Sequence, residues 1–524
     1  MGQPERYDAI VVGSGHNGLI AAGYLAQSGK HVLVLERRDI IGGAAVTEDT
    51  FPGYRLSTCS YVCNLLLPEV VDDLQLVKYG YHVRPFEPTY FVPFPDGDYF
   101  MTFLDGDRTR EQIARHSKKD ADAYGHYWAM WDRILDRMQP LIRRPAPTEA
   151  EIAAAFAGPD GKEDWKILTE TSIGDLLDRY FESDKVKAPY ATGGVIGVNA
   201  GPRDPGTAYV KFHHLIGSID GHQGAWGFVR GGMGSITQAL AHACRDRGVE
   251  ILTSAEVEEI ELEWRRDRRS FVRWATLCCA NRRLECRSPS HLPRHGGRLH
   301  LPADLVAGIE QMRVKGSVVK LLVGMGELPD FTAMPGKEVG VQHTGGIVIN
   351  PSIDYLQAAW EDCQRGNPSR LPFMDIYIQT ATEDGTGLAP SGKHTLSAFV
   401  QYAPYDLAEG TWDERRAEIG QTIVDTIAAY APNFRARSST CRCWDHPTSN
   451  GSSVSRAGIS SMARSCRTRC SATGRSWIRR LSDANRRTLS LWQRGVAGRR
   501  VFGAPGRNAA LRILGAFGDP AVRA

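Results

Sequence analysis

The chain has 524 residues, and 63 Lys and Arg against 60 Asp and Glu give a net charge of +3. With 42% hydrophobic and 23% charged residues, the composition is that of a globular protein and excludes a disordered tail or a collagen-like repeat. No run of about 18 uninterrupted apolar residues is present, and Met1 leads directly into a strand-like segment. We therefore expect a cytoplasmic protein without a signal peptide or a membrane-spanning helix.

The positive charge is concentrated in two segments, residues 264–300 and 436–500. The first has ten Arg and two acidic residues, the second has fourteen Arg and two acidic residues, and neither has a Lys. Neither shows a sustained period of 2 or 3.6. Basic loops for nucleic acid or an anionic membrane are one interpretation. We favour out-of-frame translation of a GC-rich gene, which yields Arg, Ser and Cys with little Lys, and we expect no nucleic-acid partner.

The chain begins with a pattern typical of a βαβ unit. An apolar strand over 7–12 is followed by a helix over 17–27 and a second apolar strand over 31–35 that ends at Glu36. This is the shortest unit that a right-handed crossover allows. Beyond it the patterns predict, in chain order, helices over 109–142, 173–180 and 235–247, strands over 249–252, 257–262, 315–324, 373–380 and 395–402, a helix over 415–430 and a terminal helix over 503–514.

This alternation predicts an α/β fold with two domains. One is a Rossmann-like nucleotide-binding domain, with three layers around a parallel sheet, and it is assembled from separated pieces. The other is an α+β substrate domain inserted between those pieces. The expected boundaries are 1–105 and 221–300 for the nucleotide-binding domain, 106–220 for a mostly helical cap, 301–435 for the substrate sheet and helix, 436–500 for the second Arg-rich segment, and 501–524 for the terminal helix.

The first strand and helix are joined by a glycine-rich turn, GSGHNG over residues 13–18. Gly13 allows a tight turn, Gly15 lets a pyrophosphate approach the backbone, and Gly18 lets the helix pack close to the sheet. The phosphates would meet the free N–H groups of a helix N-terminus. Glu36 lies where a carboxylate accepts hydrogen bonds from an adenosine ribose. The first predicted cofactor residues are Gly13, Ser14, Gly15, Asn17, Gly18 and Glu36.

A second glycine pair follows the acidic residue and favours FAD over NAD. Gly42, Gly43 and Ala44 would bring further backbone amides to the diphosphate, as an extended cofactor needs. Arg37 either contacts the adenine-ribose end or a phosphate, or is an ordinary surface charge.

The motifs together resemble the phytoene desaturase-like flavoproteins. The resemblance rests on VVGSGHNGL from residue 11, VLERR from 34, GGAAVTE from 42, GGMGS from 231, QYAPY from 401 and GAPGRNAA from 503. It covers about 5–263, 301–435 and 501–516 and is absent from the two Arg-rich segments. It implies non-covalent FAD with Val257 near the adenine, and hydride transfer between a hydrophobic substrate, such as an isoprenoid or polyene, and flavin N5.

Two other functions stay open: a flavin amine oxidase, and a flavin-binding protein with little turnover. Peripheral contact with a membrane is an option for a greasy substrate. Cys59 and Cys63 lack the pattern of a flavin disulfide reductase, and we expect no metal site. His213 and His214 are expected to be structural, since nothing nearby forms a catalytic triad. The catalytic residues are not predicted.

Overall fold

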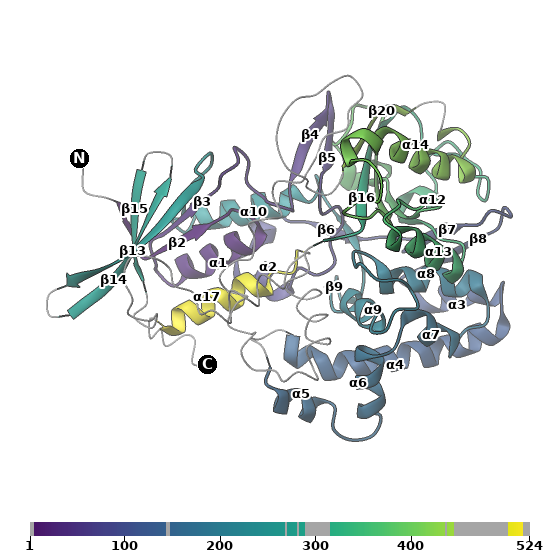
Figure 1. The fold of residues 1–524 in the computed structure, drawn as a ribbon, viewed down its shortest axis with the longest axis horizontal. Coiled ribbons are helices and arrows are strands. Elements are labelled where there is room, and N and C mark those ends of the chain that lie inside the picture. Colours follow the sequence, from purple (N-terminus) through teal and green to yellow (C-terminus); the bar gives the residue numbers. More distant parts are fainter. Residues whose placement is uncertain are drawn as a thin grey trace.

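The computed structural model describes residues 5–142, 147–267, 270–279, 282–288, 315–434, 438–444 and 501–516. Figure 1 shows two lobes side by side. The lobe on the left contains the N-terminal strands and the terminal helix, and the lobe on the right contains a large sheet with helices around it.

The first lobe is built on a parallel sheet of three strands, in the order β12-β3-β2. It contains β2 (Ala9–Val12), β3 (Val32–Leu35) and β12 (Glu250–Leu252). α1 (His16–Gln27) joins β2 to β3, and α10 (Gly234–Arg245) packs beside α1 and leads into β12. The predicted βαβ unit is therefore confirmed, because parallel neighbours need such a crossover.

Alternate residues of β3 face different layers. Val32 and Val34 belong to the large core that includes α1 and α10. Leu33 and Leu35 point to the other side, where Val257 packs against them. The sheet is thus covered on both faces, as expected for a three-layer nucleotide-binding domain.

A second sheet of four strands follows β12 along the chain. Its order is β1-β15-β14-β13, with β1 (Glu5–Tyr7), β13 (Val257–Asp267), β14 (Ser270–Cys279) and β15 (Arg282–Ser288). β14 and β15 lie inside the Arg-rich segment 264–300, where the sequence shows no strand period. These strands form without that period, because a ladder forms through main-chain hydrogen bonds and does not require alternating side chains.

The terminal helix belongs to the first lobe, and two pairs of strands connect this lobe to the second. α17 (Ala504–Ala516) packs along α1, although almost 500 residues separate them in the sequence. The hairpin of β4 (Thr47–Phe51) and β5 (Tyr54–Ser57) reaches the large sheet, where Leu56 packs against Leu322. β6 (Val83–Pro85) pairs with β11 (Gly227–Val229).

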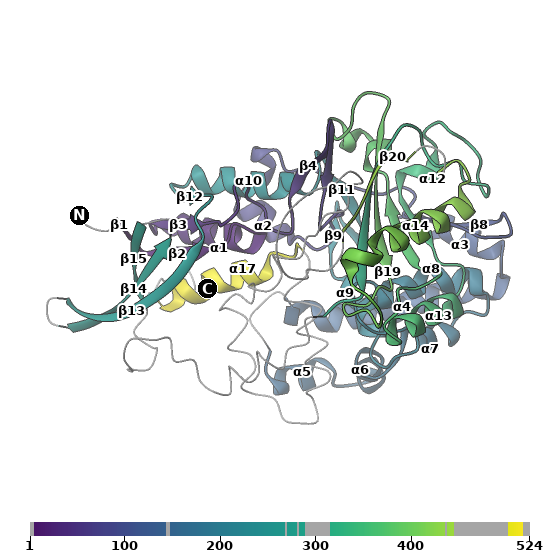
Figure 2. The same ribbon diagram turned by 45° about the horizontal axis from the view of Figure 1, so that its top comes forward.

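The second lobe contains a mixed sheet in the order β20-β16-β19-β18-β17-β7-β8. α14 (Trp412–Tyr430) covers one of its faces (Figure 2). The first two strands of this sheet precede residue 105 in the sequence. The strands are β7 (Tyr90–Pro93), β8 (Tyr99–Thr102), β16 (Val318–Met325), β17 (Gly346–Ile349), β18 (Phe373–Tyr377), β19 (His394–Gln401) and β20 (Ser438–Trp444).

A group of helices packs beside this sheet. The segment 109–142, predicted as one helix, forms two, and Asp105 caps the first by accepting bonds from the amides of Asp107 and Arg108. The group comprises α3 (Gly106–Ala114), α4 (Lys118–Ile142), α5 (Glu149–Ala155), α6 (Gly161–Thr169), α7 (Ile173–Asp178), α8 (Asp184–Val195) and α9 (Ala208–Leu215).

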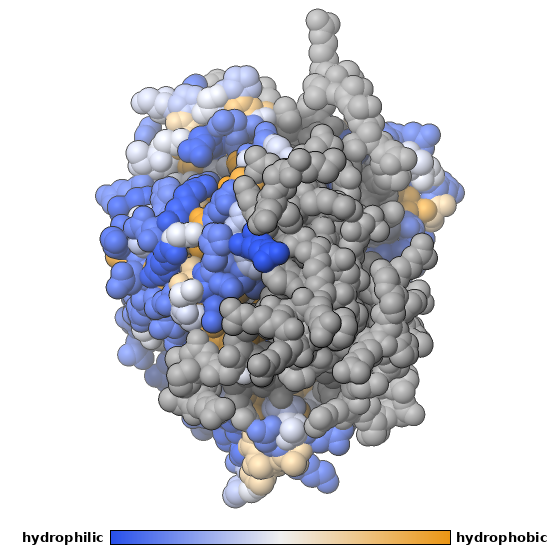
Figure 3. Space-filling model, turned by 90° about the vertical axis from the view of Figure 1, so that its left-hand side faces the viewer, coloured by the Kyte–Doolittle hydropathy of each residue, from blue (hydrophilic) through white to orange (hydrophobic). Residues whose placement is uncertain are grey.

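The remaining elements are short or peripheral. They are α2 (Pro68–Asp73), α12 (Val341–Thr344), α13 (Ile353–Gln364), β9 (Ser218–Ile219), β10 (His222–Gln223) and 3-10 turns at Leu76–Tyr79, Gln379–Ala381 and Glu383–Gly385. Within the described ranges, no helix combines the length and apolarity that a membrane span requires. On the face seen in Figure 3, the described surface is mostly hydrophilic, with scattered apolar side chains.

Candidate functional site

The glycine turn between β2 and α1 has a backbone that only glycine tolerates. Gly13 has a φ of +100°, in the left-handed region. A Cβ on Gly18 would lie 2.1 Å from the carbonyl oxygen of Gly13, so α1 could not approach the turn with any larger residue. No side chain caps α1, which begins after Gly15. The turn therefore presents the first amides of a helix in the form that suits a phosphate.

The second glycine pair lies directly beside this turn. The amide of Gly42 donates to the carbonyl of Ser14 at 3.1 Å, and Gly42 forms a parallel bridge with Gly15. Gly42 and Gly43 have φ values of +125° and +61°. A Cβ on Gly42 would lie 2.9 Å from Thr237 Oγ1. The structure thus brings together the two glycine loops that the sequence singled out, with Ala44 half-buried next to them.

Glu36 is buried behind the turn and is bonded to the protein itself. Its Oε2 accepts hydrogen bonds from Ser14 N (2.9 Å) and Ser14 Oγ (2.8 Å), and its Oε1 accepts one from Arg38 N (3.1 Å). The sequence predicted that the Glu36 carboxylate binds the ribose and that Ser14 contacts the cofactor. Here the two residues fix the turn to the end of β3. Arg37 is half-buried beside them.

Val257 is placed next to Glu36 by the loop before β13. The amide of Ala255 donates to the carbonyl of Glu36 at 2.8 Å, and that of Ser254 donates to the carbonyl of Arg38. These bonds hold the start of β13 at the end of β3, where the resemblance expects the adenine.

The N-terminus of α17 closes the other side of the turn. Gly506 N donates to Asn17 Oδ1 at 3.3 Å, and a Cβ on Gly506 would lie 2.3 Å from the carbonyl oxygen of Asn17. Asn508 Oδ1 is buried and has no hydrogen-bond partner within the described residues. Two helix starts, two glycine loops and an unsatisfied amide oxygen lie around this turn and fit a dinucleotide cofactor.

On the second lobe, one face of the large sheet carries charged and aromatic side chains. Lys320 of β16 pairs with Phe399 of β19, which pairs with Asp375 of β18. Residues paired across strands point to the same face, so these three form one row. Tyr61, from the loop after β5, lies over the row: its ring centroid is 6.0 Å from that of Phe399, and its hydroxyl donates to Asp375 Oδ2 at 3.5 Å.

Lys320 is the most unusual group in this row. Its Nζ donates to the carbonyls of Ser57 (2.7 Å) and Cys59 (3.0 Å) and lies 4.4 Å from the ring centroid of Tyr61. Burial lowers the pKa of Lys320 from its ordinary value to about 7. A lysine with this pKa is able to hold or release a proton near neutral pH.

Sequence analysis did not single out Lys320, Asp375, Phe399 or Tyr61. The available signal was a lysine inside the apolar run VVKLLVG (318–324), since lysine is almost never fully buried without a reason. Asp375, in the equally apolar FMDIY of β18, gives the same signal.

The other sequence candidates lie elsewhere or are structural. His213 and His214 are buried in α9, and Cys59 is exposed whereas Cys63 is buried. In the described part of the chain, no three His, Cys, Asp or Glu side chains are grouped to bind a metal. Cys441 and Cys443 are in β20, and the remaining cysteines of the second Arg-rich segment are outside the described residues.

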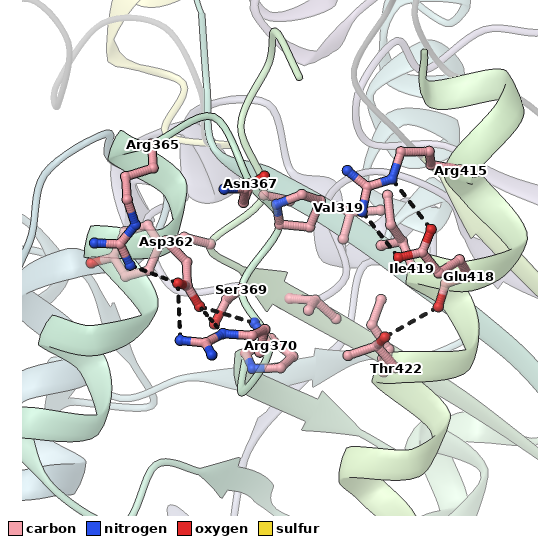
Figure 4. A pocket seen from close by; sticks show the side chains of 16 residues that line it. Val319, Asp362, Arg365, Asn367, Ser369, Arg370, Arg415, Glu418, Ile419 and Thr422 are labelled. Carbon is pink, nitrogen blue, oxygen red and sulfur yellow. Dashed lines mark hydrogen bonds and ion pairs between the residues drawn. The ribbon is translucent and has the colours of Figure 1, made fainter. Parts of the chain in front are cut away.

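A pocket of about 470 Å³ lies on the opposite face of the sheet (Figure 4). Val319 and Val400 form part of its wall, and both alternate with the residues of the Lys320 row. Its arginines are already paired, Arg415 with Glu418 and Arg365 with Asp362. This pocket is therefore on the other side of the sheet from the Lys320 row.

Comparison with known proteins identifies the family. The sequence profile described as flavin containing amine oxidoreductase matches residues 18–286, from the glycine turn to β15. The chain belongs to the flavin-containing amine oxidoreductase family. The matched range includes residues 264–286 of the first Arg-rich segment.

Relatives within this family agree with that assignment. The chain is 33% identical over 468 residues to pyridine nucleotide-disulfide oxidoreductase domain-containing protein 2 of Rattus norvegicus, which covers 83% of this chain and 80% of the relative. It is 24% identical over 258 residues to a phytoene desaturase (neurosporene-forming) of Rhodobacter capsulatus, covering 48% and 47%. These matches confirm the resemblance inferred from the motifs.

A solved structure confirms the fold. An oxidoreductase from Methanosarcina mazei superimposes with a TM-score of 0.52 at 15% identity, covering 97% of this chain and 99% of that one. The α/β architecture, with a Rossmann-like FAD-binding domain and a substrate domain, is therefore as predicted. Family membership also confirms FAD as the cofactor and an FAD-dependent oxidoreductase as the class of enzyme.

Proposed function

We propose that this family member dehydrogenates a hydrophobic substrate, such as an isoprenoid or polyene. The observation that carries the proposal is the face of the large sheet that bears Lys320, Phe399 and Asp375. Phe399, Tyr61 and Tyr377 are gathered there, with ring centroids 5.3 Å apart for Tyr61 and Tyr377 and 6.0 Å apart for Tyr61 and Phe399. Such a surface favours an apolar, flat or unsaturated molecule.

The bound flavin supplies a hydride acceptor. The protein's part is to orient the substrate and to manage the proton that accompanies removal of a hydride from carbon. Lys320 is suited to take up that proton, because its pKa of about 7 leaves a large neutral fraction at physiological pH. The two carbonyls that hold Nζ fix its position while leaving the third ammonium position to face the aromatic residues.

A second candidate is oxidation of an amine, and one observation favours it. Asp375 lies in the same row and is buried, with only 4% of its surface exposed. Its Oδ2 accepts a hydrogen bond from the hydroxyl of Tyr377 at 3.1 Å. A carboxylate next to an aromatic wall is a suitable partner for a substrate ammonium group. The family description itself includes amine oxidation.

The test is anaerobic reduction of the FAD-loaded protein. The protein is mixed in separate experiments with an acyclic polyene such as phytoene and with aliphatic mono- and diamines, and loss of the visible flavin absorbance is followed. Bleaching by the polyene alone supports the proposal. Bleaching by amines alone replaces it with the second candidate, and an oxidised flavin with every donor contradicts both and favours a binding protein with little turnover. Partners and membrane contact are tested separately, by sedimentation with lipid vesicles.

A further inference from the structure

The pocket in Figure 4 is formed where α14 and the loop 365–372 meet one face of the large sheet. Its volume of about 470 Å³ is in the range of small-molecule sites, which are roughly 300–1,000 Å³. Part of its lining is apolar. Val319 and Val400 are paired across β16 and β19, Ile419 and Ile423 are one turn apart on α14, and all four are buried. The pocket therefore offers an apolar base to a bound molecule.

The loop 365–372 is a fixed wall of this pocket. The amide of Asn367 donates to the carbonyl of Asp362 at 3.0 Å, and the amide of Ala408 donates to the carbonyl of Gly366 at 2.8 Å. Gly366 has a φ of +79°, and a Cβ there would lie 2.9 Å from Ala408 Cβ, so this close passage requires glycine. A wall that is formed before a ligand arrives lowers the entropy cost of binding.

Of the three arginines that line the pocket, Arg370 has the longest bonds to a carboxylate. Asp362 accepts a bond from Arg365 Nη2 at 2.8 Å, whereas its bonds from Arg370 Nε and Nη2 are 3.4 Å each. Arg415, on the other side of the pocket, is paired with Glu418 at 3.0 and 3.2 Å (Figure 4). The side chain of Arg370 is 85% exposed. Its guanidinium is therefore loosely held and has further N–H groups to offer a ligand.

We propose that this pocket binds a small molecule with a flat apolar body and one carboxylate. The body would lie against Val319, Val400 and Ile423, and Arg370 would hold the carboxylate. A guanidinium group suits this role, because its planar fork forms two parallel, charge-assisted hydrogen bonds with a carboxylate. The pocket is on the other side of the sheet from the Lys320 row. It is thus a second binding site, and its assignment does not rest on the proposed function.

The test uses 2-naphthoate and 2-naphthylmethanol as probes, because they share a ring system and differ in charge. Binding to the FAD-loaded full chain is measured by titration calorimetry for the wild type, Arg370→Met and Thr422→Trp. Thr422 lines the pocket, so an indole at this position would fill it. Arg179→Met is the control for charge, since Arg179 is an exposed arginine paired with Glu163 outside the pocket. Gln421→Trp, at an exposed position of α14, is the control for the indole. Circular dichroism and FAD content establish that each variant is folded.

We expect the wild type to bind 2-naphthoate about tenfold more tightly than 2-naphthylmethanol, as one charge-assisted pair of hydrogen bonds allows. Arg370→Met should lose this preference with 2-naphthylmethanol binding unchanged. Thr422→Trp should weaken the binding of both probes about tenfold, because they compete with the indole for the same volume. The two control variants should match the wild type. Equal or undetectable binding of the two probes by the wild type, an unchanged preference in Arg370→Met, or unchanged affinities in Thr422→Trp would overturn the proposal.

A second measurement needs only the wild type and applies if a variant does not fold. Because Arg370 is exposed, dissolved salt screens its attraction for an anion. The preference for 2-naphthoate should therefore decline as the ionic strength rises from about 0.05 to about 0.5 M, while the binding of 2-naphthylmethanol does not weaken. A preference that does not change with salt contradicts the proposal. A flavin that no donor reduces, with the preference intact, concerns the proposed function alone.

Discussion

Replacing Lys320 with Met should change how the stability of the protein depends on pH. Lys320 has a pKa of about 7 in the folded protein, against an ordinary value of 10.5. This difference corresponds to about 5 kcal/mol of penalty for keeping the buried ammonium charged. Because the unfolded chain binds the proton up to a higher pH than the folded chain does, the penalty is nearly complete below pH 7 and declines as the pH rises toward 10.5.

The expected magnitude follows from these two values. From about pH 7 to pH 9, the wild type should gain about 2 kcal/mol of unfolding free energy relative to Lys320→Met, which has no group to titrate. The bonds from Nζ to the carbonyls of Ser57 and Cys59 are lost in the variant at both pH values and so contribute a constant offset. The free energy of unfolding is measured in urea by circular dichroism with saturating FAD.

Lys119→Met serves as the control for this experiment. Lys119 is exposed, and its ion pair with Glu182 raises its pKa, so it stays charged in the folded protein across the range. The difference in the free energy of unfolding between Lys119→Met and the wild type should not change between the two pH values. If the difference between Lys320→Met and the wild type is also independent of pH, Lys320 keeps an ordinary pKa and its assignment as the proton-accepting group is wrong.

Three further results are expected. Gly18→Ala should reduce FAD binding at least tenfold, measured by flavin fluorescence, because its Cβ would lie 2.1 Å from a backbone carbonyl; Gly125→Ala, with nothing within 4 Å, should bind FAD normally. Glu36→Gln should weaken FAD binding about tenfold, because its amide nitrogen must face either Ser14 or the amide of Arg38 and cannot accept the bond donated there. Resequencing the gene should reveal a frame error across 436–500, and an unbroken frame would end that hypothesis.

The cofactor half of the protein could be predicted because its signals are local. The glycine turn, the crossover helix and Glu36 lie within about thirty residues, and the turn needs glycine for backbone reasons that the sequence displays directly. What could not be predicted is that the Glu36 carboxylate accepts hydrogen bonds from Ser14. That bond depends on the distance between two loops, and no residue pattern encodes it.

The substrate half was harder to predict because its site is assembled across the chain. Tyr61, Lys320, Asp375 and Phe399 come from four segments, and Tyr61 is separated from Asp375 by 314 residues. Their alignment depends on the register of β16, β19 and β18, and a shift of one residue would turn Lys320 to the opposite face. The sequence shows two charges in apolar strands without showing that they face the same side.

This difference also explains why the aromatic side chains alone do not identify the substrate and why a charged residue is the best guide to it. Apolar walls accept many molecules at similar affinity, so Tyr61, Phe399 and Tyr377 restrict size and shape more than identity. A buried charge is more selective, because a substrate that displaces its partners without replacing them loses the cost of its burial. Asp375, buried in the Lys320 row, therefore distinguishes an amine from a polyene better than the aromatic side chains do, and the comparison of these two donors measures that distinction directly.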